Sequence, residues 1–263
     1  MRAVLGIRAI KRLGQNFLTD EKIAERIVGY ANLNSEDTVL EIGPGLGTLT
    51  ELIAKKSKLV IGIEKDKRLA DYLKARKINN LKIINADVLE IDFPEFNKIV
   101  SNLPYQISSQ LTFKILNYKF EKAILCFQKE FAYRLVAEPY SKDYSRLTVN
   151  TYYRAHCKIL EIIPRTAFYP QPKVESAIVE LIPHKAKPFR LVNEQVFNNL
   201  VNICFSHRRK KISSIISNNW QKFFKTETDA EKLIPELEFK DRRIEELYPH
   251  EIAKLANQIA RFY

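Results

Sequence analysis

Hydrophobic residues recur along this chain in two alternating patterns. Short apolar runs bounded by polar residues predict strands buried in a sheet, and apolar residues three or four positions apart predict helices packed on it. The runs lie at residues 38–42, 59–63, 81–84, 99–101 and 123–127, and helical spacing occurs at 20–32, 49–55 and 67–75. This alternation predicts an α/β fold with a doubly wound, mostly parallel sheet and helices on both faces.

The first of these helices has a start signal, because Thr19 or Asp20 is available as its N-cap. Three later segments, 147–153, 157–163 and 176–183, have the apolar content of strands. The first and last alternate apolar and polar residues, so we expect them to form an antiparallel edge on the parallel sheet.

The pattern changes near residue 184. Residues 182–188 are polar and contain two prolines, a composition typical of a linker. Beyond them, helical spacing occurs at 196–205, 212–224, 229–237 and 250–262. We therefore expect two domains: an α/β domain over 1–184, which includes a basic N-terminal arm, and a small all-α domain over 185–263.

A glycine-rich segment, Glu41-Ile42-Gly43-Pro44-Gly45-Leu46-Gly47, joins the first strand to a helix. Glycines there let the backbone turn sharply and approach a ligand closely. The third glycine comes one position earlier than in the dinucleotide pattern, and Glu41 would repel a pyrophosphate. A carboxylate suits the cationic end of S-adenosylmethionine, so Glu41, Gly43, Gly45 and Gly47 are predicted cofactor residues. A glycine turn without a ligand is the alternative at this point.

Two more acidic residues follow the next two strands. Glu64 ends the second strand, where a carboxylate can accept both ribose hydroxyls, and Asp87 follows the third, where an acceptor can hold an adenine amino group. Together with Glu41 they come at the ends of three successive strands, and ligands bind at the carboxyl edge of open α/β sheets. This arrangement favours a nucleoside-containing cofactor over three solvated strand ends.

The chemistry is indicated by Asn102-Leu103-Pro104-Tyr105, which follows the fourth strand. Adenine N6 is a poor nucleophile because its lone pair is delocalised into the ring, and acceptors on its N–H groups favour a tetrahedral nitrogen. The predicted acceptors are the side-chain oxygen of Asn102 and the carbonyl of Leu103, which Pro104 biases to an extended conformation. Tyr105 is predicted to stack on the base. No strong general base is needed, because the product amine loses its proton easily once alkylated. The in-line methyl transfer itself depends mainly on positioning.

A base must leave its stack to reach such a site, so a second aromatic residue is expected on its far face. Phe168, in the rigid segment Phe168-Tyr169-Pro170-Gln171-Pro172, is the predicted partner. An ordinary proline-rich turn packed on the core is the alternative interpretation.

The composition of the chain predicts a polyanionic partner. The chain has 43 Lys and Arg residues against 31 Asp and Glu, a formal net charge of +12. This excess points to nucleic acid or an anionic membrane, although a Lys-rich protein without such a partner has the same composition. The N-terminal segment is a basic arm on nucleic acid or a disordered tail. The predicted RNA contacts are Arg208, Arg209, Lys210, Lys211, Lys11 and Arg12.

Cysteine usage and apolar content suggest where the protein works. Cys126, Cys157 and Cys204 are widely spaced and lack metal-ligand spacing, which predicts buried thiols in a reducing cytoplasm and no metal site. No apolar run reaches the roughly 18 residues of a membrane span, and residues 1–14 lack the apolar core of a signal peptide. We expect a cytoplasmic monomer without membrane contact.

Six motifs, in order, resemble those of the ribosomal RNA adenine N6,N6-dimethyltransferases. They are Gln15-Asn16-Phe17-Leu18, the glycine segment, Glu64-Lys65-Asp66, Ala86-Asp87, Asn102-Leu103-Pro104-Tyr105 and Phe168-x-Pro170-x-Pro172-x-Val174-x-Ser176. Residues 141–147 and 205–210 are similar to the family as well, so the resemblance spans nearly the whole chain. Ser145, where the family often has Gly, is a minor difference.

The resemblance implies a Rossmann-like S-adenosylmethionine-dependent methyltransferase domain and a small helical domain for RNA. It implies dimethylation of N6 of two adjacent adenosines in the 3′-terminal hairpin of small-subunit ribosomal RNA. A pre-30S-type particle is then the expected partner, and an assembly checkpoint an expected further role. In the family, residues matching Tyr105 stack on the target base and others contact the cofactor. The latter match Asn16, Leu18, Gly43, Glu64, Asp87 and Asn102, to which we add the neighbours Gln15, Lys65 and Val88.

Other functions fit part of the pattern. An antibiotic-resistance methyltransferase acting on large-subunit ribosomal RNA shares the fold and cofactor motifs, but Leu103 and residues 141–144 are more similar to the small-subunit enzymes. A non-catalytic RNA-binding assembly factor would not need Asn102 and Tyr105, which are both present. A DNA adenine methyltransferase would share only the proline-aromatic motif.

Overall fold

The computed structural model describes residues 8–263, which form two compact units. The first unit runs to Ala132 and resumes over Ala155–Pro183, and the second comprises Tyr133–Arg154 and His184–Tyr263. The single boundary expected after residue 184 is therefore corrected. The segment 133–154 groups with the second unit because its buried side chains Tyr144 and Val149 belong to that unit's core.

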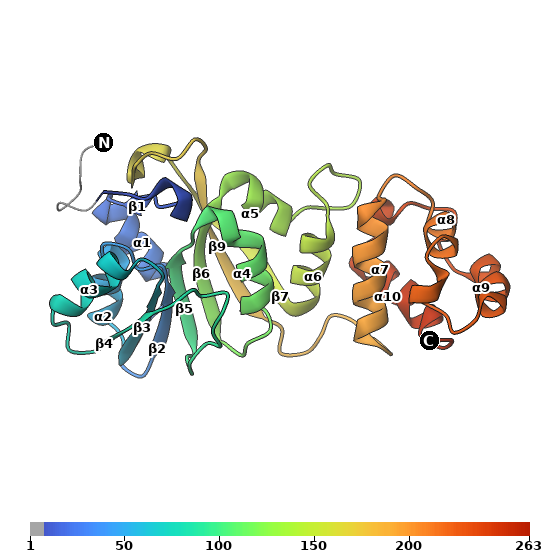
Figure 1. The fold of residues 1–263 in the computed structure, drawn as a ribbon, viewed down its shortest axis with the longest axis horizontal. Helices are drawn as coiled ribbons and strands as arrows, with labels where there is room; N and C mark the ends of the chain where they lie inside the picture. The colour runs from blue at the N-terminus through green and yellow to red at the C-terminus, as the bar shows by residue number, and fades with distance from the viewer. Residues whose placement is uncertain (1–7) are drawn as a thin grey trace. The chain divides into compact units, whose positions relative to one another are not determined.

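A seven-stranded sheet forms the centre of the first unit (Figure 1), in the order β4-β3-β2-β5-β6-β9-β7. All neighbouring strands are parallel except β9, which is antiparallel to both β6 and β7. This confirms the predicted fold class. The strands are β2 (Thr38–Ile42), β3 (Leu59–Glu64), β4 (Leu81–Asn85), β5 (Lys98–Asn102), β6 (Lys122–Gln128), β7 (Ala155–Ile163) and β9 (Ser176–Pro183).

The order of strands along the sheet reverses between β2 and β5, which lie side by side. At such a switch point, the connections after the two strands leave in opposite directions and a crevice opens at the carboxyl edge of the sheet. The fold therefore places a binding crevice next to the glycine segment after β2 and the Asn102 turn after β5.

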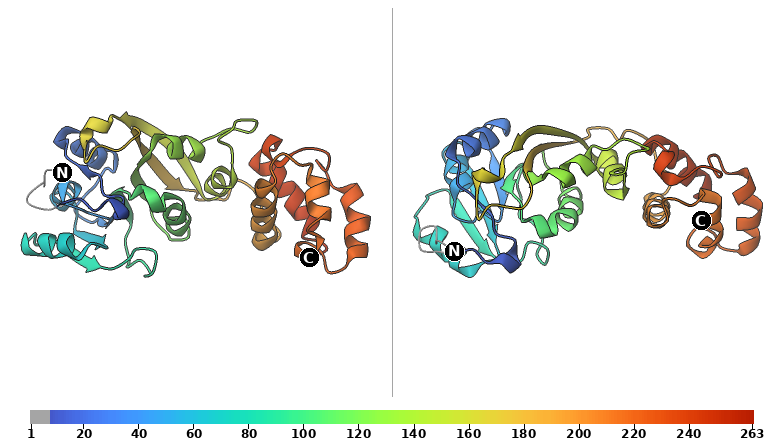
Figure 2. Two further views of the ribbon diagram at one scale, coloured as in Figure 1. Left: turned by 45° about the horizontal axis from the view of Figure 1, so that its top comes forward. Right: turned by 90° about the horizontal axis from the view of Figure 1, so that it is seen from above.

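Helices cover both faces of this sheet (Figure 2). On one face, α1 (Glu21–Tyr30) and α2 (Thr48–Ala54) bury Ile27 and Ile53 against the strands, and α4 (Ser108–Ile115) lies on the other. Asp20 is the N-cap of α1, as predicted, because its Oδ1 accepts the N–H of Ile23 at 3.0 Å. Two further helices are α3 (Lys67–Ala75), beside β3 and β4, and α5 (Lys129–Leu135), after β6.

A separate antiparallel pair joins the N-terminal segment to the loop before β9. It consists of β1 (Phe17–Leu18) and β8 (Phe168–Tyr169), with Leu18 paired to Phe168. The N–H of Thr19 extends the pair by donating to the carbonyl of Ala167 at 2.9 Å. Three 3-10 helices belong to the same unit: η1 (Lys11–Leu13), η2 (Tyr105–Ile107) and η3 (Arg165–Ala167).

The second unit is built from helices packed around a core that includes Phe197, Leu200 and Ile252. The longer helices are α6 (Arg146–Arg154), α7 (Glu194–Ser206), α8 (Ile212–Ser217), α9 (Glu227–Leu233) and α10 (Pro249–Ile259). The 3-10 helices are η4 (Trp220–Lys222), η5 (Ile234–Glu236) and η6 (Ile244–Glu246). None of the helices in the described part of the chain has the length and apolar character that crossing a membrane requires.

The strand predicted at 147–153 is wrong, because these residues form α6. Except for Tyr152, which is exposed, the apolar residues and the polar residues between them are buried, so the alternation did not mark one exposed face and one buried face. Two of the buried polar side chains are satisfied locally. Asn150 Nδ2 donates to the carbonyl of Arg146 at 2.8 Å, and the hydroxyl of Thr148 donates to the carbonyl of Arg134 at 2.7 Å.

Candidate active site

A cavity opens at the carboxyl ends of β2, β3 and β5, where the strand order reverses. Its lining brings together nearly all the predicted cofactor and catalytic residues from five separate segments of the chain. These residues are Gln15, Asn16, Leu18, Glu41, Gly43, Gly45, Glu64, Lys65, Asp87, Val88, Asn102, Leu103, Pro104 and Tyr105. Gly47 and Phe168, also predicted for the site, do not line it.

The glycine segment turns through left-handed backbone at three positions, with φ of +66° at Gly43, +61° at Gly45 and +88° at Gly47. Residues with a Cβ disfavour this region. A Cβ on Gly45 would also lie 3.2 Å from the ring of Phe17. Gly47 is the N-cap of α2, and a Cβ there would lie 2.8 Å from Leu73 of α3. Its role is therefore to let α2 begin close to α3.

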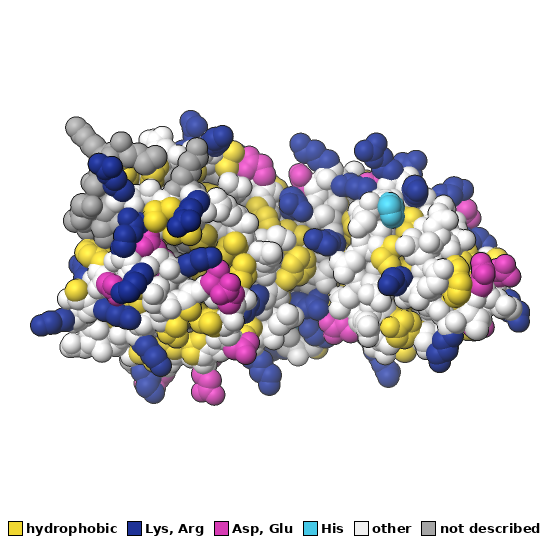
Figure 3. Space-filling view, in the orientation of Figure 1, with side chains coloured by type: hydrophobic (Ala, Val, Ile, Leu, Met, Phe, Trp, Pro, Cys, Tyr) yellow, Lys and Arg dark blue, Asp and Glu magenta, His cyan; other side chains and the backbone are white. Residues whose placement is uncertain are grey.

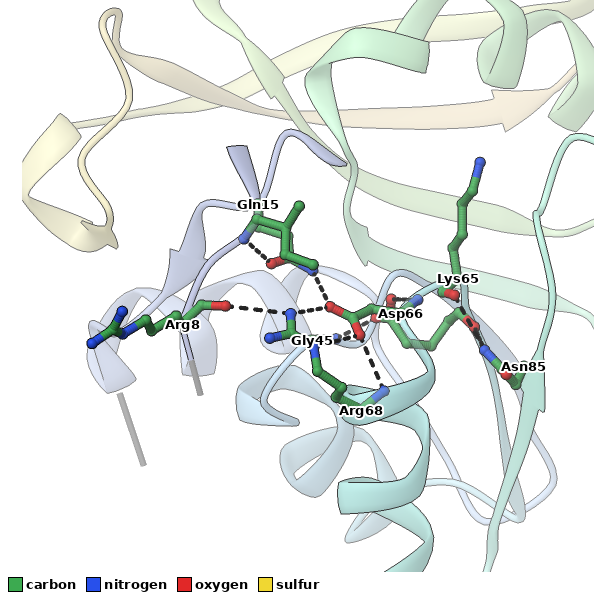
Figure 4. A network of polar contacts seen from close by, with 9 residues as sticks. Arg8, Gln15, Gly45, Lys65, Asp66, Arg68 and Asn85 are labelled. Carbon is green, nitrogen blue, oxygen red and sulfur yellow. Dashed lines mark hydrogen bonds and ion pairs between the residues drawn. The ribbon is translucent and has the colours of Figure 1, made fainter. Parts of the chain in front are cut away.

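Glu64, at the end of β3, holds the glycine segment in place. Its Oε2 accepts the N–H of Gly45 at 3.1 Å and its Oε1 accepts the N–H of Asp66 at 2.9 Å (Figure 4). Burial raises the pKa of Glu64, and the hydrogen bonds from these two N–H groups oppose the rise. Each carboxylate oxygen can accept more than one hydrogen bond, so both oxygens can still accept a hydroxyl group of a ligand.

The N-terminal segment lines one side of the cavity and is fastened by a polar network (Figure 4). Gln15 Nε2 donates to Asp66 Oδ2 at 2.9 Å, and Gln15 Oε1 accepts the N–H of Ile10 at 2.6 Å. Arg68 donates to the same Asp66 carboxylate at 2.6 Å and to the carbonyl of Arg8 at 3.3 Å. Gln15 therefore links this segment to the start of α3, where Asp66 is the N-cap.

Glu41 lines the cavity, yet its side chain is nearly inaccessible to water, with 1% exposed. Its Oε2 has no hydrogen-bond partner among the described residues. Burial raises the pKa of this carboxyl group to about 8; the Thr50 hydroxyl opposes the rise and the Glu64 carboxylate adds to it. A buried carboxyl group without a counter-ion suits a cationic ligand, because a positive charge nearby stabilises its ionised form.

Asp87, in the turn after β4, forms an ion pair with Lys65. The hydrogen bond from Lys65 holds the pKa of Asp87 below its ordinary value, and the N–H of Leu89, which Oδ1 accepts at 3.0 Å, has the same effect. Two predicted cofactor residues thus contact each other. An amino group of a ligand that binds Asp87 would share the carboxylate with Lys65.

Asn102, the last residue of β5, has its side-chain amide fixed in one orientation. Its Nδ2 donates to the carbonyl of Asn16 at 3.0 Å, and a carbonyl can only accept, so Oδ1 is left for another donor. This oxygen is buried and has no partner among the described residues. The structure therefore brings an unused acceptor to the cavity, as the predicted chemistry requires.

Tyr105 is the aromatic residue of the predicted pair that reaches the cavity. Its hydroxyl lies 2.5 Å from the hydroxyl of Ser176 on β9, a contact that fixes the ring. Burial raises the pKa of Tyr105, so the phenol stays protonated. The preceding residues are equally constrained, because the N–H of Leu103 donates to the carbonyl of Cys126 at 3.3 Å and Pro104 has extended backbone.

Phe168 does not reach the cavity. Its side chain is 2% exposed and packs in the apolar core between α1, α2 and the sheet. Its partner in the β1–β8 pair, Leu18, enters the same core. The predicted stacking role of Phe168 is therefore corrected, and the alternative of core packing describes this residue.

Sequence patterns did not single out the apolar residues at the cavity. Phe17, Leu46 and Leu69 line it and form a small buried cluster. In a sequence such residues look like ordinary core residues, because nothing in their spacing distinguishes a cavity wall from a packed interior. The place of Phe17 between Asn16 and Leu18, within a recognised motif, is the one signal that could have found it.

The predicted RNA contacts in the second unit differ in whether their charges are paired with acidic residues. The charge of Arg208 is paired with Glu245, and its guanidinium also donates to the carbonyls of Ser141 and Lys142. Lys211 pairs with Asp241 at 3.1 Å, although both side chains are exposed. Arg209 and Lys210 are exposed and form no ion pair with any described residue.

The two basic residues predicted in the N-terminal arm have different outcomes. Arg12 lines the cavity of the first unit. The side chain of Lys11 lies outside the part of the chain that the structure describes, as do residues 1–7 of the predicted arm.

Comparison with known proteins matches residues 7–257 to the family model for ribosomal RNA adenine dimethylase. A probable ribosomal RNA small subunit methyltransferase A of Methanosarcina acetivorans is 45% identical, over 98% of this chain and 97% of that protein. A dimethyladenosine transferase structure from Plasmodium falciparum has a TM-score of 0.80 and 32% identity, over 91% of this chain and 95% of that one. The 23S rRNA methyltransferase ErmE has a TM-score of 0.69 and 28% identity, over 93% and 100%.

The fold and the site together define a Rossmann-like, S-adenosylmethionine-dependent methyltransferase. Within that class, the chain belongs to the ribosomal RNA adenine dimethylase family. The predicted family and the predicted enzyme class are thereby confirmed.

Proposed function

We propose that this protein transfers methyl groups from S-adenosylmethionine to N6 of two adjacent adenosines in the 3′-terminal hairpin of small-subunit ribosomal RNA. The observation that carries the proposal is the buried Oδ1 of Asn102, an acceptor at the cavity that has no donor among the described residues. It accepts one N–H of the target amine, and the carbonyl of Leu103 accepts the other. These bonds draw the lone pair of the nitrogen out of the ring, while Tyr105 stacks on the base.

The residues of the cavity fit the cofactor, which supplies an electrophilic methyl group on a sulfonium. In this proposal Glu64 accepts the ribose hydroxyls, Asp87 accepts the adenine amino group and Glu41 favours the cationic end. The left-handed turns at Gly43 and Gly45 let the backbone approach the ligand. The remaining contacts come from Gln15, Asn16, Leu18, Lys65 and Val88.

Small-subunit RNA is favoured as the substrate over large-subunit RNA. The relative named for the small subunit is 45% identical over nearly the whole chain, whereas the 23S rRNA methyltransferase is 28% identical. A pre-30S-type particle is then the partner, and methylation would mark one stage of its assembly.

Phosphates of this RNA require positive charge on the protein. The free cations Arg209 and Lys210 of the second unit, and Arg12 at the cavity, are the contacts we assign among the predicted residues. Lys and Arg side chains are spread over the face shown in Figure 3, in both units, rather than gathered in one patch. An extended polyanion suits such a distribution.

The direct test incubates the full chain with labelled S-adenosylmethionine and undermethylated small ribosomal subunits, followed by digestion of the RNA. Labelled dimethyladenosine near the 3′ end is the expected product. Label found only in large-subunit RNA would support the antibiotic-resistance reaction instead, and RNA binding without any label would support a non-catalytic assembly factor.

The mechanism is tested with Asn102→Ala. Loss of the acceptor should lower the rate of methyl transfer roughly 100-fold or more, with cofactor affinity measured by calorimetry nearly unchanged. Asn117→Ala is the matched control, because Asn117 is an exposed asparagine of the same unit. Normal turnover by Asn102→Ala would refute the assigned role.

A further inference from the structure

Tyr140 combines two unusual properties on the surface of the second unit. Its side chain is 69% exposed, the largest exposed fraction among the exposed large hydrophobic residues that the structure describes. Its backbone is left-handed, with φ of +68°, a conformation that bulky residues disfavour and that Gly or Asn adopts readily. Strained backbone that presents a specific side chain is a reason to look for a ligand.

The loop that carries Tyr140 connects α5 to α6 and is held in place by hydrogen bonds. The N–H of Tyr140 donates to the carbonyl of Glu245 at 2.8 Å, and its hydroxyl accepts from Arg242 Nη2, also at 2.8 Å. Arg208 clamps the next two residues through their carbonyls, at 3.1 Å to Ser141 and 2.9 Å to Lys142. These hydrogen bonds hold the hydroxyl of Tyr140 and the backbone of the loop, and the ring of Tyr140 makes no aromatic or cation–π contact with any described residue.

The same contacts gather unpaired positive charge around the loop. Arg208 joins the loop to the segment that follows α7, and a bridge between Lys211 and Arg243 joins that segment to the start of η6. Four exposed cations in these three segments form no ion pair with any described residue. They are Lys142, Arg209, Lys210 and Arg243.

Three of the acidic side chains nearby are engaged, whereas Glu138 and Asp143, in the loop itself, form no ion pair with any described residue. Glu245 pairs with Arg208, and Glu246 lies 3.6 Å from the guanidinium of Arg242. Glu251 pairs with Arg242 at 3.2 Å and accepts the N–H of Tyr248. The four unpaired cations outnumber the carboxylates of Glu138 and Asp143, so the charge left over at this surface is positive, which favours a polyanion over a neutral or acidic partner surface.

We propose that Tyr140 stacks on an unpaired nucleobase of the RNA substrate, while the four free cations contact the phosphates beside it. An exposed ring among cations is the combination that binds single-stranded nucleic acid, since every base offers a π-face and every nucleotide a charge. This inference rests on the proposed function, in that it takes RNA as the substrate. It adds a second base contact, in the helical unit, to the stacking assigned to Tyr105.

The test compares the full-length chain with Tyr140→Gly and Tyr140→Phe, using fluorescence anisotropy. The probes are an RNA hairpin with unpaired adenines in its loop and a fully paired RNA duplex of the same composition. Tyr140→Gly should weaken hairpin binding roughly tenfold and leave duplex binding unchanged, because only an unpaired base can stack on the ring. Tyr140→Phe keeps the ring and should bind the hairpin like the unmodified chain.

Two controls separate stacking from a structural role. Glycine suits φ of +68°, so Tyr140→Gly should keep the melting temperature of the unmodified protein. Tyr152→Ala removes another exposed tyrosine of the same unit and should change neither affinity. If Tyr140→Phe lost as much affinity as Tyr140→Gly, the hydroxyl contact with Arg242 would be the important feature and stacking would be refuted.

The outcome is distinguishable from failure of the proposed function. Unchanged hairpin affinity in Tyr140→Gly, in a chain that still methylates small-subunit RNA, overturns the stacking role alone. Absence of methylation by the unmodified chain overturns the proposed function. A higher KM for RNA with an unchanged kcat in Tyr140→Gly would support the stacking role during turnover.

Discussion

The carboxyl group of Glu41 lies at the cavity wall, where water barely reaches it, and one of its oxygens has no hydrogen-bond partner in the part of the chain that the structure describes. An ionised carboxylate in such a place is costly, and its pKa of about 8 reflects that cost. Without a cation beside it, the carboxyl group therefore favours its neutral form near neutral pH. A cation in the cavity would favour the ionised form.

This makes the stability of the cofactor-free chain depend on pH. A carboxyl group whose pKa rises from 4.5 to about 8 on folding binds an extra proton in the folded state between these values. Its contribution to stability is fully present below 4.5 and is lost as the pH rises toward 8. Glu41→Gln removes this loss, so its free energy of unfolding relative to the unmodified chain should rise by on the order of a few kcal/mol across the window.

Urea unfolding near the two ends of this window measures the difference. Glu36→Gln serves as the control, because Glu36 is an exposed carboxylate of the same unit. A constant difference between Glu41→Gln and the unmodified chain at both pH values would show that Glu41 titrates normally.

At the scale of elements, the sequence predicted β2 and α3 with the bounds that the structure has. The strand is buried on both faces and was marked by a short apolar run, whereas the helix buries one face and was marked by helical spacing. The pattern failed for α6, because the polar residues Thr148, Asn150 and Thr151 are buried together with the apolar ones and so do not mark an exposed face. Alternation along a sequence reports exposure only when one side of the element faces water.

Phe168 shows the same limit for a site residue. The motif predicts that Phe168 is important but not where its side chain points, because the pairing of β8 with β1 depends on Leu18, which is far away in the sequence. With its side chain in the core, Phe168→Ala should lower the free energy of unfolding by about 3–5 kcal/mol. Denaturant unfolding measures this, with Phe262→Ala, at an exposed position, as the control.

One outcome would instead support the stacking role of Phe168 that the sequence predicted. If Phe168→Ala kept the stability of the unmodified chain and lost methyl transfer, the aromatic ring would act on the substrate rather than in the core.

At the scale of the whole molecule, composition predicts a polyanionic partner but cannot say which cations meet it. The pairing of Arg208 with Glu245 joins residues 37 positions apart, and only the folded unit brings them together. The insertion of 133–154 into the helical unit was equally hidden, since that segment lies within the sequence of the α/β domain. The sequence alone therefore could not distinguish Arg209 and Lys210, which form no ion pair with any described residue, from Arg208, whose charge is paired.

The salt dependence of RNA binding tests this separation. Replacing Arg209 and Lys210 with Ala should flatten the slope of log affinity against log salt concentration by about one unit for each cation removed. Arg208→Ala should leave the slope nearly unchanged, because its charge is already paired with Glu245, and should instead loosen the loop at Ser141 and Lys142. Equal flattening by both variants would show that Arg208 also meets phosphate.

The N-terminal wall of the cavity bears on how a dimethylated base is completed. Dimethylation of an adenine adds two methyl groups, so one molecule of cofactor must be exchanged for another between the two transfers. The part of the lining before β1 is fastened by the side chains of Gln15 and Arg68, whereas the remainder belongs to β1, to strands of the sheet or to the turns and helices that follow them. If cofactor exchange requires this wall to open, its opening rate relative to the lifetime of the bound RNA would decide whether catalysis is processive or releases a monomethylated product.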